Sequence, residues 1–399
     1  MSGAAATPPA AGRSTLRLLY LCGAMQGLAL VTFPAASAIF ASPTGFHLSS
    51  AQYGAMFVPQ VALAIVASAA GPWLARRLGM RGLLLLGLGA DLLAMSLLAA
   101  SALLIRASAA FVMLCCATAV LGFGFGATVT TLNTLVERLA ADRPDAAVLT
   151  LNALLGVGTA LAPALVALFA ALGVWWVLPA LTAIFAAVLL VSFAASKSAL
   201  GPAAAATVAG AELPRRFWLY AAAALLYGIV ETLCGNWATL YLSAERSVPA
   251  ANASYALAAF WLMITLGRVA LAGTERWLPA KWTYVALPLA LAVVFQLVAH
   301  ADGALTGTLA FGAAGLACSG VLPLSVSLGG TEFPTRAATI SGELIAFYQI
   351  GYGVAAFGVG PLKELGGVDY STAFSLGSLA SVLLGGFALA VVRRSAAAA

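Results

Sequence analysis

Ionisable side chains are scarce in this chain of 399 residues. Asp, Glu, Lys and Arg together make up only 8% of it, whereas a soluble domain carries roughly 25%. Hydrophobic residues make up 63%, and the mean hydropathy is +1.03. So few charges cannot cover a water-exposed surface. This excludes a soluble globular protein, and the chain belongs in a membrane.

Metal-ligating and catalytic side chains are equally sparse. The two histidines, His47 and His300, stand alone near expected helix ends. All five cysteines fall within apolar stretches, where they are typical of small buried residues with free thiols. No connection holds a nucleophile–base pair, a phosphate-binding loop or a cluster with metal-ligand spacing. We therefore expect no enzymatic activity, no metal and no cofactor.

Apolar runs broken by Pro, Gly or charge divide the chain into segments long enough to cross a bilayer. We expect an all-α membrane protein of twelve transmembrane helices in two six-helix, pseudo-symmetric halves. The predicted organisation is a tail at 1–17, a first half at 18–196, a linker at 197–216, a second half at 217–392 and a tail at 393–399. The expected spans are 18–41, 51–74, 82–104, 109–135, 147–170, 173–196, 217–242, 251–273, 282–300, 304–329, 337–360 and 371–392.

The placement of Lys and Arg predicts the orientation. With the N-terminus inside, fifteen of them fall in inner loops and three in outer loops, and Arg268 lies within a span, which accounts for all 19. That is the bias of the positive-inside rule, so both termini are expected in the cytoplasm. Because the positive charge is explained in this way, the net charge of +6 does not indicate nucleic-acid binding. The expected partners are the lipid bilayer, a small-molecule substrate and a coupling ion, with the protein acting as a monomer.

The two predicted halves repeat glycine-rich patterns six spans apart. GVGTALAP (Gly156–Pro163) in the fifth span matches GYGVAAFGVGP (Gly351–Pro361) in the eleventh. GFGFG in the fourth span matches GLACSG in the tenth. Such repeats favour duplicated halves related by an axis along the membrane normal. Chance matching of Ala/Gly-rich sequence is the alternative.

The loop GPWLARRLGMRG (Gly71–Gly82) joins the second and third predicted spans and is rich in Gly and Arg. It is similar to the basic signature of the major facilitator superfamily, which the chain resembles over nearly its whole length, although Arg76 stands where an acid is usual. YGIVETLCGNWATLYL (Tyr227–Leu242) resembles the seventh span of the fucose permease-type sugar/proton symporters. Their acid in the fourth span has no counterpart near Gly126–Thr128. The resemblance implies a transporter that works by alternating access.

Glu231 carries the sharpest functional hypothesis. It is the only ionisable carboxylate in Phe217–Leu242, and an acid at that depth usually faces protein or water. Partial burial with access to water would let it take up and release a proton. We expect Glu231 to couple transport to protons, with sodium as the alternative ion. A structural acid bonded to a neighbouring helix is the competing interpretation.

Asn236 and Trp237 are expected to meet substrate nearer the outside, where the helix could unwind at Gly235. Amide, ring and acid together suit a polyhydroxylated ligand. Asp91, near the middle of the third span, is either structural or a second coupling acid. The remaining candidate substrate contacts lie on helices that line the cavity in this superfamily; they are Gln26, Asn152, Tyr348 and Gln349.

Four charged residues are candidates for gating. Arg77 and Arg81 belong to the basic signature, and Arg268 and Glu343 are expected to pair between spans eight and eleven. The favoured function is a proton-coupled importer of a sugar or sugar-like solute in a bacterial inner (plasma) membrane. Efflux of drugs or amphiphilic metabolites is the alternative.

Overall fold

A computed structural model describes residues 10–105, 107–140, 142–196, 213–274, 277 and 279–396. Every regular element in these ranges is a helix. The predicted linker lies outside the described residues up to 212, as do 1–9 and 397–399 of the predicted tails.

The helices follow the apolar runs of the sequence. They are α1 (Ala10–Ala35), α2 (Ser37–Ala41), α3 (Ser50–Ala55), α4 (Phe57–Ser101), η1 (Ala102–Leu104), α5 (Ala109–Leu139), α6 (Pro144–Ala171), α7 (Val177–Ala195), α8 (Phe217–Ala244), α9 (Ala250–Thr274), α10 (Ala280–Ala299), α11 (Ala304–Cys318), α12 (Val321–Glu332), η2 (Pro334–Arg336), α13 (Ala337–Glu364) and α14 (Tyr370–Ala396).

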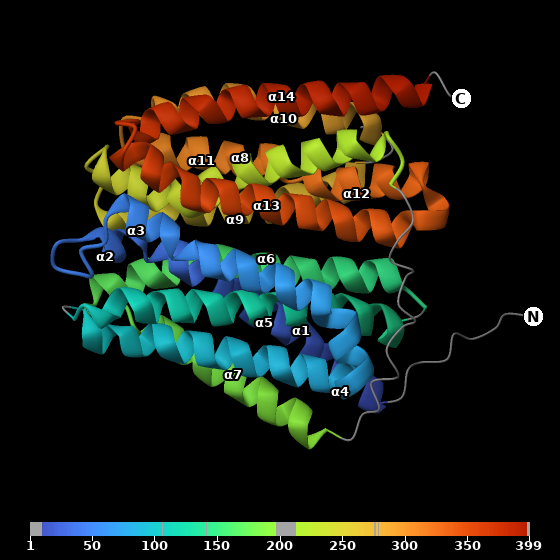
Figure 1. Ribbon diagram of the computed structural model, residues 1–399, viewed down its shortest axis with the longest axis horizontal. Coiled ribbons are helices and arrows are strands. Elements are labelled where there is room, and N and C mark those ends of the chain that lie inside the picture. The colour runs from blue at the N-terminus through green and yellow to red at the C-terminus, as the bar shows by residue number, and fades with distance from the viewer. Residues whose placement is uncertain are drawn as a thin grey trace, which may run out of the picture.

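Eleven stretches of the described chain are long and apolar enough to cross a membrane. One of them, Ser50–Leu104, has 55 residues, whereas a single crossing needs about 20. Within it, Gly79 has φ 73° and ψ 165°, a left-handed backbone conformation that favours glycine. Figure 1 shows α4 turning back on itself near its label. The chain is a multi-pass membrane protein.

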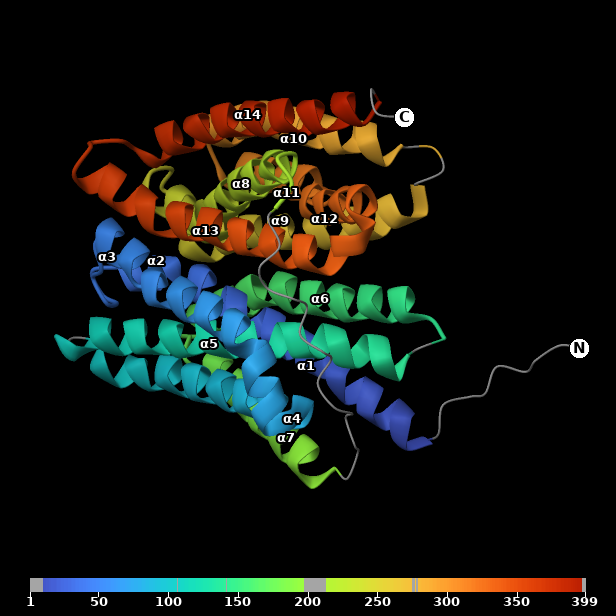
Figure 2. The same ribbon diagram turned by 45° about the vertical axis from the view of Figure 1, so that its right-hand side comes forward.

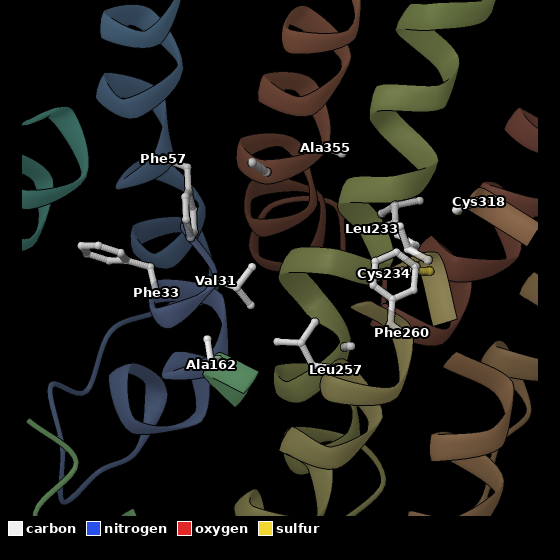
Figure 3. Packing of buried hydrophobic residues seen from close by; sticks show 14 of the residues in the cluster. Val31, Phe33, Phe57, Ala162, Leu233, Cys234, Leu257, Phe260, Cys318 and Ala355 are labelled. Atoms are coloured by element: carbon white, nitrogen blue, oxygen red, sulfur yellow. The ribbon is translucent and has the colours of Figure 1, made fainter. Parts of the chain in front are cut away.

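Helices α1–α7 pack together, and α8–α14 pack together beside them (Figures 1 and 2). The first described turn of α1 and the last turns of α14 lie at the same end of the molecule. The two groups meet along α6 and α9 on one side, and along α3, α4 and α13 on the other. A shared core runs between them, and Figure 3 shows Val31 and Phe57 from one group with Leu257 and Phe260 from the other.

Glycines allow several helix pairs to approach until their backbones touch. A Cβ atom on Gly158 would lie 2.1 Å from the carbonyl oxygen of Ala24, so α1 and α6 are in direct backbone contact. A Cβ on Gly351 would lie 2.0 Å from the carbonyl oxygen of Leu225, which brings α8 and α13 equally close. Small residues at such crossings are typical of membrane helices.

Long apolar side chains cover the outside of the bundle. Examples at least half exposed are Leu93, Val112, Val191, Val293 and Leu309. A soluble monomer rarely exposes apolar surface on this scale. This surface is therefore the one that contacts lipid.

Candidate functional site

Glu231 lies on α8 with only 4% of its surface exposed. Its two carboxylate oxygens accept hydrogen bonds from two tyrosine hydroxyls: Tyr227 donates to Oε1 at 2.7 Å and Tyr348 donates to Oε2 at 2.5 Å. Tyr227 lies one turn earlier on α8, as the helical spacing predicts. Tyr348 comes from α13, which can reach the carboxylate because Gly228 and Gly351 let the two helices touch.

Arg268 lies close to this carboxylate cluster. Its guanidinium interacts electrostatically with Tyr227, Tyr348 and Cys318, all of which also interact with Glu231. Its Nε donates to the carbonyl oxygen of Ser319 at 3.3 Å. Arg268 therefore lies near the two tyrosines that bind Glu231.

The predicted pairing of Arg268 with Glu343 is wrong for this structure. The ion pairs of the described residues join other partners: Arg216 with Glu332, Arg246 with Asp302, and Lys363 with Glu245. Arg268 instead bonds the carbonyl oxygen of Ser319 and lies near the tyrosines that bind Glu231, whereas Glu343 lies near the start of α13.

A cavity of about 40 Å³ lies where the two groups of helices meet. A cavity of that size has room for a few water molecules. Polar and apolar side chains share its wall, so it offers both hydrogen bonds and apolar contact. The lining residues are Leu30, Gln60, Val61, Ala64, Gly122, Phe125, Tyr348, Gln349 and Tyr352.

Tyr348 and Gln349, two of the predicted substrate contacts, thus line the cavity. Gln60 and Tyr352 line it as well and were missed by the sequence analysis. The Tyr352 hydroxyl accepts from Gln60 Nε2 and Asn236 Nδ2, each at 3.4 Å. Gln60 Oε1 is buried without a hydrogen-bond partner in the described part of the chain, so it is free to accept one from a ligand. Tyr352 could have been found by its spacing, because it follows Tyr348 by one turn.

The expectation that α8 unwinds at Gly235 is wrong, because α8 is continuous from Phe217 to Ala244. A Cβ on Gly235 would lie 3.0 Å from the Trp261 ring, so this glycine makes room for α9. Trp237 is fully buried and donates through Nε1 to the carbonyl oxygen of Ala355 at 3.0 Å. Its ring packs edge-on against Tyr53 at 5.0 Å between centroids, which places it in the contact between the two groups of helices.

Asp91 and Gln26 form a separate polar cluster within the first group of helices. Both are fully buried. Gln26 Nε2 donates to Asp91 Oδ1 at 3.3 Å, and Thr128 donates to Gln26 Oε1 at 2.7 Å. Asp91 Oδ2 has no partner among the described residues. Gln26 does not line the 40 Å³ cavity, and Asn152 uses its amide to bond Val148 one turn back on α6.

The two arginines of the basic signature are bound within the first group. Arg81 donates through Nη2 to the carbonyl oxygens of Phe193 and Ala194, at 2.9 and 2.7 Å, and so caps the end of α7. Arg77 stacks over Trp73, one turn earlier on α4. Both side chains thus contact residues of the first group of helices, Arg81 on α7 and Arg77 on α4 itself.

At the end opposite the described termini, polar contacts join the two groups directly. Ser50 and Tyr370 share a hydrogen bond of 2.8 Å, and the backbone N–H of Ala51 donates to Glu364 Oε1 at 2.8 Å. Beside them, Lys363 forms an ion pair with Glu245 at 2.6 Å. We refer to Ser50, Ala51, Glu364 and Tyr370 as the end contact.

The described part of the chain holds no group of three or more His, Cys, Asp or Glu side chains that could bind a metal ion. No protein-family model matches this sequence, and no curated protein matches it.

Solved structures match it over nearly the whole chain. The nucleoside transporter NupG superimposes with a TM-score of 0.75 at 15% identity, covering 95% of this chain and 99% of its own. The Escherichia coli xylose transporter XylE, in an inward-open conformation, gives 0.72 at 14% identity, with coverages of 95% and 96%. The transporter FucP, of the Major Facilitator Superfamily and in an outward conformation, gives 0.63 at 15% identity, with coverages of 96% and 99%.

The chain has the major facilitator fold. The resemblance predicted from the sequence is confirmed at this level. The glycine contacts and the cavity lie between helices that are far apart in sequence. Tyr348 connects Glu231 to the cavity, because it lines the cavity and donates a hydrogen bond to the carboxylate.

Proposed function

We propose that the protein is a secondary active transporter that moves a small polar solute, sugar or sugar-like, by alternating access. Transport is coupled to protons through Glu231. The observation that carries this proposal is the carboxylate of α8 held between two tyrosine hydroxyls, one of which, Tyr348, also lines the cavity between the groups of helices. A proton on Glu231 changes the hydrogen bonding of that cavity wall.

The nature of the cavity wall supports a polar, uncharged solute. Gln60, Gln349, Tyr348 and Tyr352 supply amide and hydroxyl groups, and Phe125 supplies an apolar ring. Such a wall suits a ligand with several hydroxyl groups and an apolar face. The solved structures with this fold include a xylose–proton symporter and a fucose–proton symporter.

The membrane topology that goes with this function has twelve spans. We propose that Ser50–Leu104 crosses twice, with Gly79 at the turn. Residues 18–196 and 217–392 then form two six-span halves. The equivalent glycine contacts, α1 with α6 and α8 with α13, support a pseudo-symmetric relation between them. The Lys and Arg distribution supports two cytoplasmic termini, and we propose a bacterial inner membrane as the location.

The test is concentrative uptake by the purified protein in vesicles with an imposed proton gradient. A thermal-shift screen against sugars, nucleosides, organic acids and drugs first identifies a ligand, since binding stabilises the folded protein. Glu231→Gln should then abolish accumulation and retain solute exchange. Asp302→Asn, which removes an exposed acid between α10 and α11, is the control and should accumulate normally. Unchanged accumulation by Glu231→Gln would refute proton coupling at this residue.

Efflux of amphiphilic compounds is the second candidate, favoured by the apolar part of the wall, Leu30, Val61 and Phe125. Cells lacking the protein would then become sensitive to hydrophobic cations. A sugar as the only hit in the thermal-shift screen would count against it.

A further inference from the structure

The span made of α11 and α12 is broken at Ser319 and Gly320. Carbonyl groups at a helix break lose their partners one turn ahead, and in a membrane they must find others. Here side chains from neighbouring helices donate to them. Tyr227 donates to the carbonyl oxygen of Cys318 at 3.0 Å, and Arg268 Nε donates to that of Ser319 at 3.3 Å.

Tyr227 therefore has two acceptors within reach, Glu231 Oε1 at 2.7 Å and the Cys318 carbonyl oxygen at 3.0 Å. A tyrosine hydroxyl carries a single hydrogen and can donate fully to only one of them at a time. Which acceptor it uses depends on the carboxyl group. An ionised carboxylate only accepts, so it draws the hydroxyl hydrogen to itself. A carboxyl group protonated on Oε1 donates to the tyrosine oxygen instead.

We propose that Tyr227 transmits the protonation state of Glu231 to the break between α11 and α12. With Glu231 ionised, Tyr227 donates to the carboxylate and the Cys318 carbonyl loses that bond. With Glu231 protonated, Tyr227 donates to the Cys318 carbonyl and holds the break. The added proton comes from water and stays on the carboxyl group, and Tyr227 keeps its own hydrogen throughout. This inference rests on the proposed role of Glu231 as the coupling acid.

The groups that face Glu231 fit this assignment. On its own helix they are Tyr227 and Cys234, and from the helices packed against it they are Arg268, Cys318, Tyr348 and Tyr352. Arg268 is the one cation among these, and it is bound to the same break. Tyr348 also donates to Glu231, but its hydroxyl makes no bond to the break among the described residues. Tyr227 is thus the positioning residue, and Tyr348 is its matched control.

Hydrogen exchange of the backbone amides at 316–324, followed by mass spectrometry and corrected for the intrinsic effect of pH, tests the proposal. In the wild type these amides should be roughly fivefold better protected at acidic than at alkaline pH, the population change that one hydrogen bond supports. Glu231→Gln should remove the pH dependence. Tyr227→Phe should also remove it and leave the break weakly protected. Tyr348→Phe should keep it.

If amide protection in Tyr227→Phe depended on pH as strongly as in the wild type, transmission through Tyr227 would be overturned. If Glu231→Gln nevertheless lost accumulation, proton coupling through Glu231 would stand without that transmission. Normal accumulation by Glu231→Gln would instead overturn the proposed function itself. If Tyr227→Phe does not fold, infrared spectra of wild-type protein with ¹³C=O cysteine give the answer. A cysteine carbonyl band should then shift to lower frequency on acidification, and an unchanged band would contradict the proposal.

Discussion

At the scale of single residues, two acids are buried within the candidate membrane-spanning helices and differ in what surrounds them. Glu231 receives two hydroxyl donors and has Arg268 nearby. Asp91 receives one long hydrogen bond from Gln26, and its second oxygen has none among the described residues. An ionised carboxylate without compensating donors is costly to bury, so the uncharged acid is the form that fits at Asp91. Glu231 has the hydrogen-bond donors that an ionised carboxylate needs, and Asp91 has fewer of them among the described residues.

This difference predicts the behaviour of Asp91→Asn. The asparagine keeps the acceptor for Gln26 and removes the need for a proton, so we expect thermal unfolding within about 0.5 kcal/mol of wild type, with proton-driven accumulation retained. Gln26→Leu strands the acid without its donor and should cost about 1–3 kcal/mol. Tryptophan fluorescence on heating in detergent measures both. Loss of accumulation in Asp91→Asn would show instead that this acid takes part in coupling.

The sequence could point to Glu231 because an acid isolated in an apolar span has few explanations, and helical spacing placed Tyr227 on its face. Tyr348 was a predicted substrate contact, but its bond to Glu231 depends on how closely α8 approaches α13. The pairing of Arg268 failed for the same reason. A charge on one helix has many potential partners, and only packing decides among them.

At the scale of helices, glycines determine which pairs of helices touch. α8 and α13 meet where Gly228 and Gly351 face carbonyl groups of Tyr348 and Leu225. That contact brings the Tyr348 hydroxyl to the Glu231 carboxylate. The sequence showed Gly351 within a glycine pattern that repeats six spans apart. It could not show which helix each glycine would meet, because that pairing joins segments more than a hundred residues apart.

Gly351→Ala should therefore damage both folding and the site. Its methyl group would lie 2.0 Å from the carbonyl oxygen of Leu225. Because that oxygen belongs to the backbone, no change of side-chain rotamer can relieve the clash. We expect a loss of about 3 kcal/mol or more in thermal unfolding. Gly358→Ala on the same helix has nothing within 4 Å and is the control; it should be neutral or slightly stabilising. Equal stability of the two variants would contradict the close contact.

At the scale of the whole molecule, the end contact joins the two groups of helices by hydrogen bonds on the side far from the described termini. Ser50 and Ala51 come from one group, and Glu364 and Tyr370 from the other. These bonds must break if the molecule is to open there. The all-helical architecture and the fold were predicted from composition and motifs alone. The end contact was not, because its residues lie at the ends of α3, α13 and α14, and only the complete fold brings those helix ends together.

Tyr370→Phe removes the hydroxyl that meets Ser50 and should favour opening at this end by roughly fivefold, the effect of one hydrogen bond. Spin labels at Thr44 and Leu365, one exposed residue from each group, report the opening as a longer distance between them. Ser378→Ala also removes a hydrogen bond from α14, but one made to Ala292 within the second group. It should leave the distance distribution unchanged. Identical distributions in both variants would show that the bond between Ser50 and Tyr370 does not hold this end closed.

The left-handed turn at Gly79 also bears on how the protein is made. The helical stretch Ser50–Leu104 has two arms that meet at Gly79 with no unstructured connection between them. The linking chain is therefore too short to keep one arm in water while the other is inserted. In the proposed topology of two crossings, we therefore expect the two arms to enter the bilayer together as one hairpin. A β-branched residue at position 79, which is strained at this φ, is expected to hinder insertion of the hairpin as well as folding.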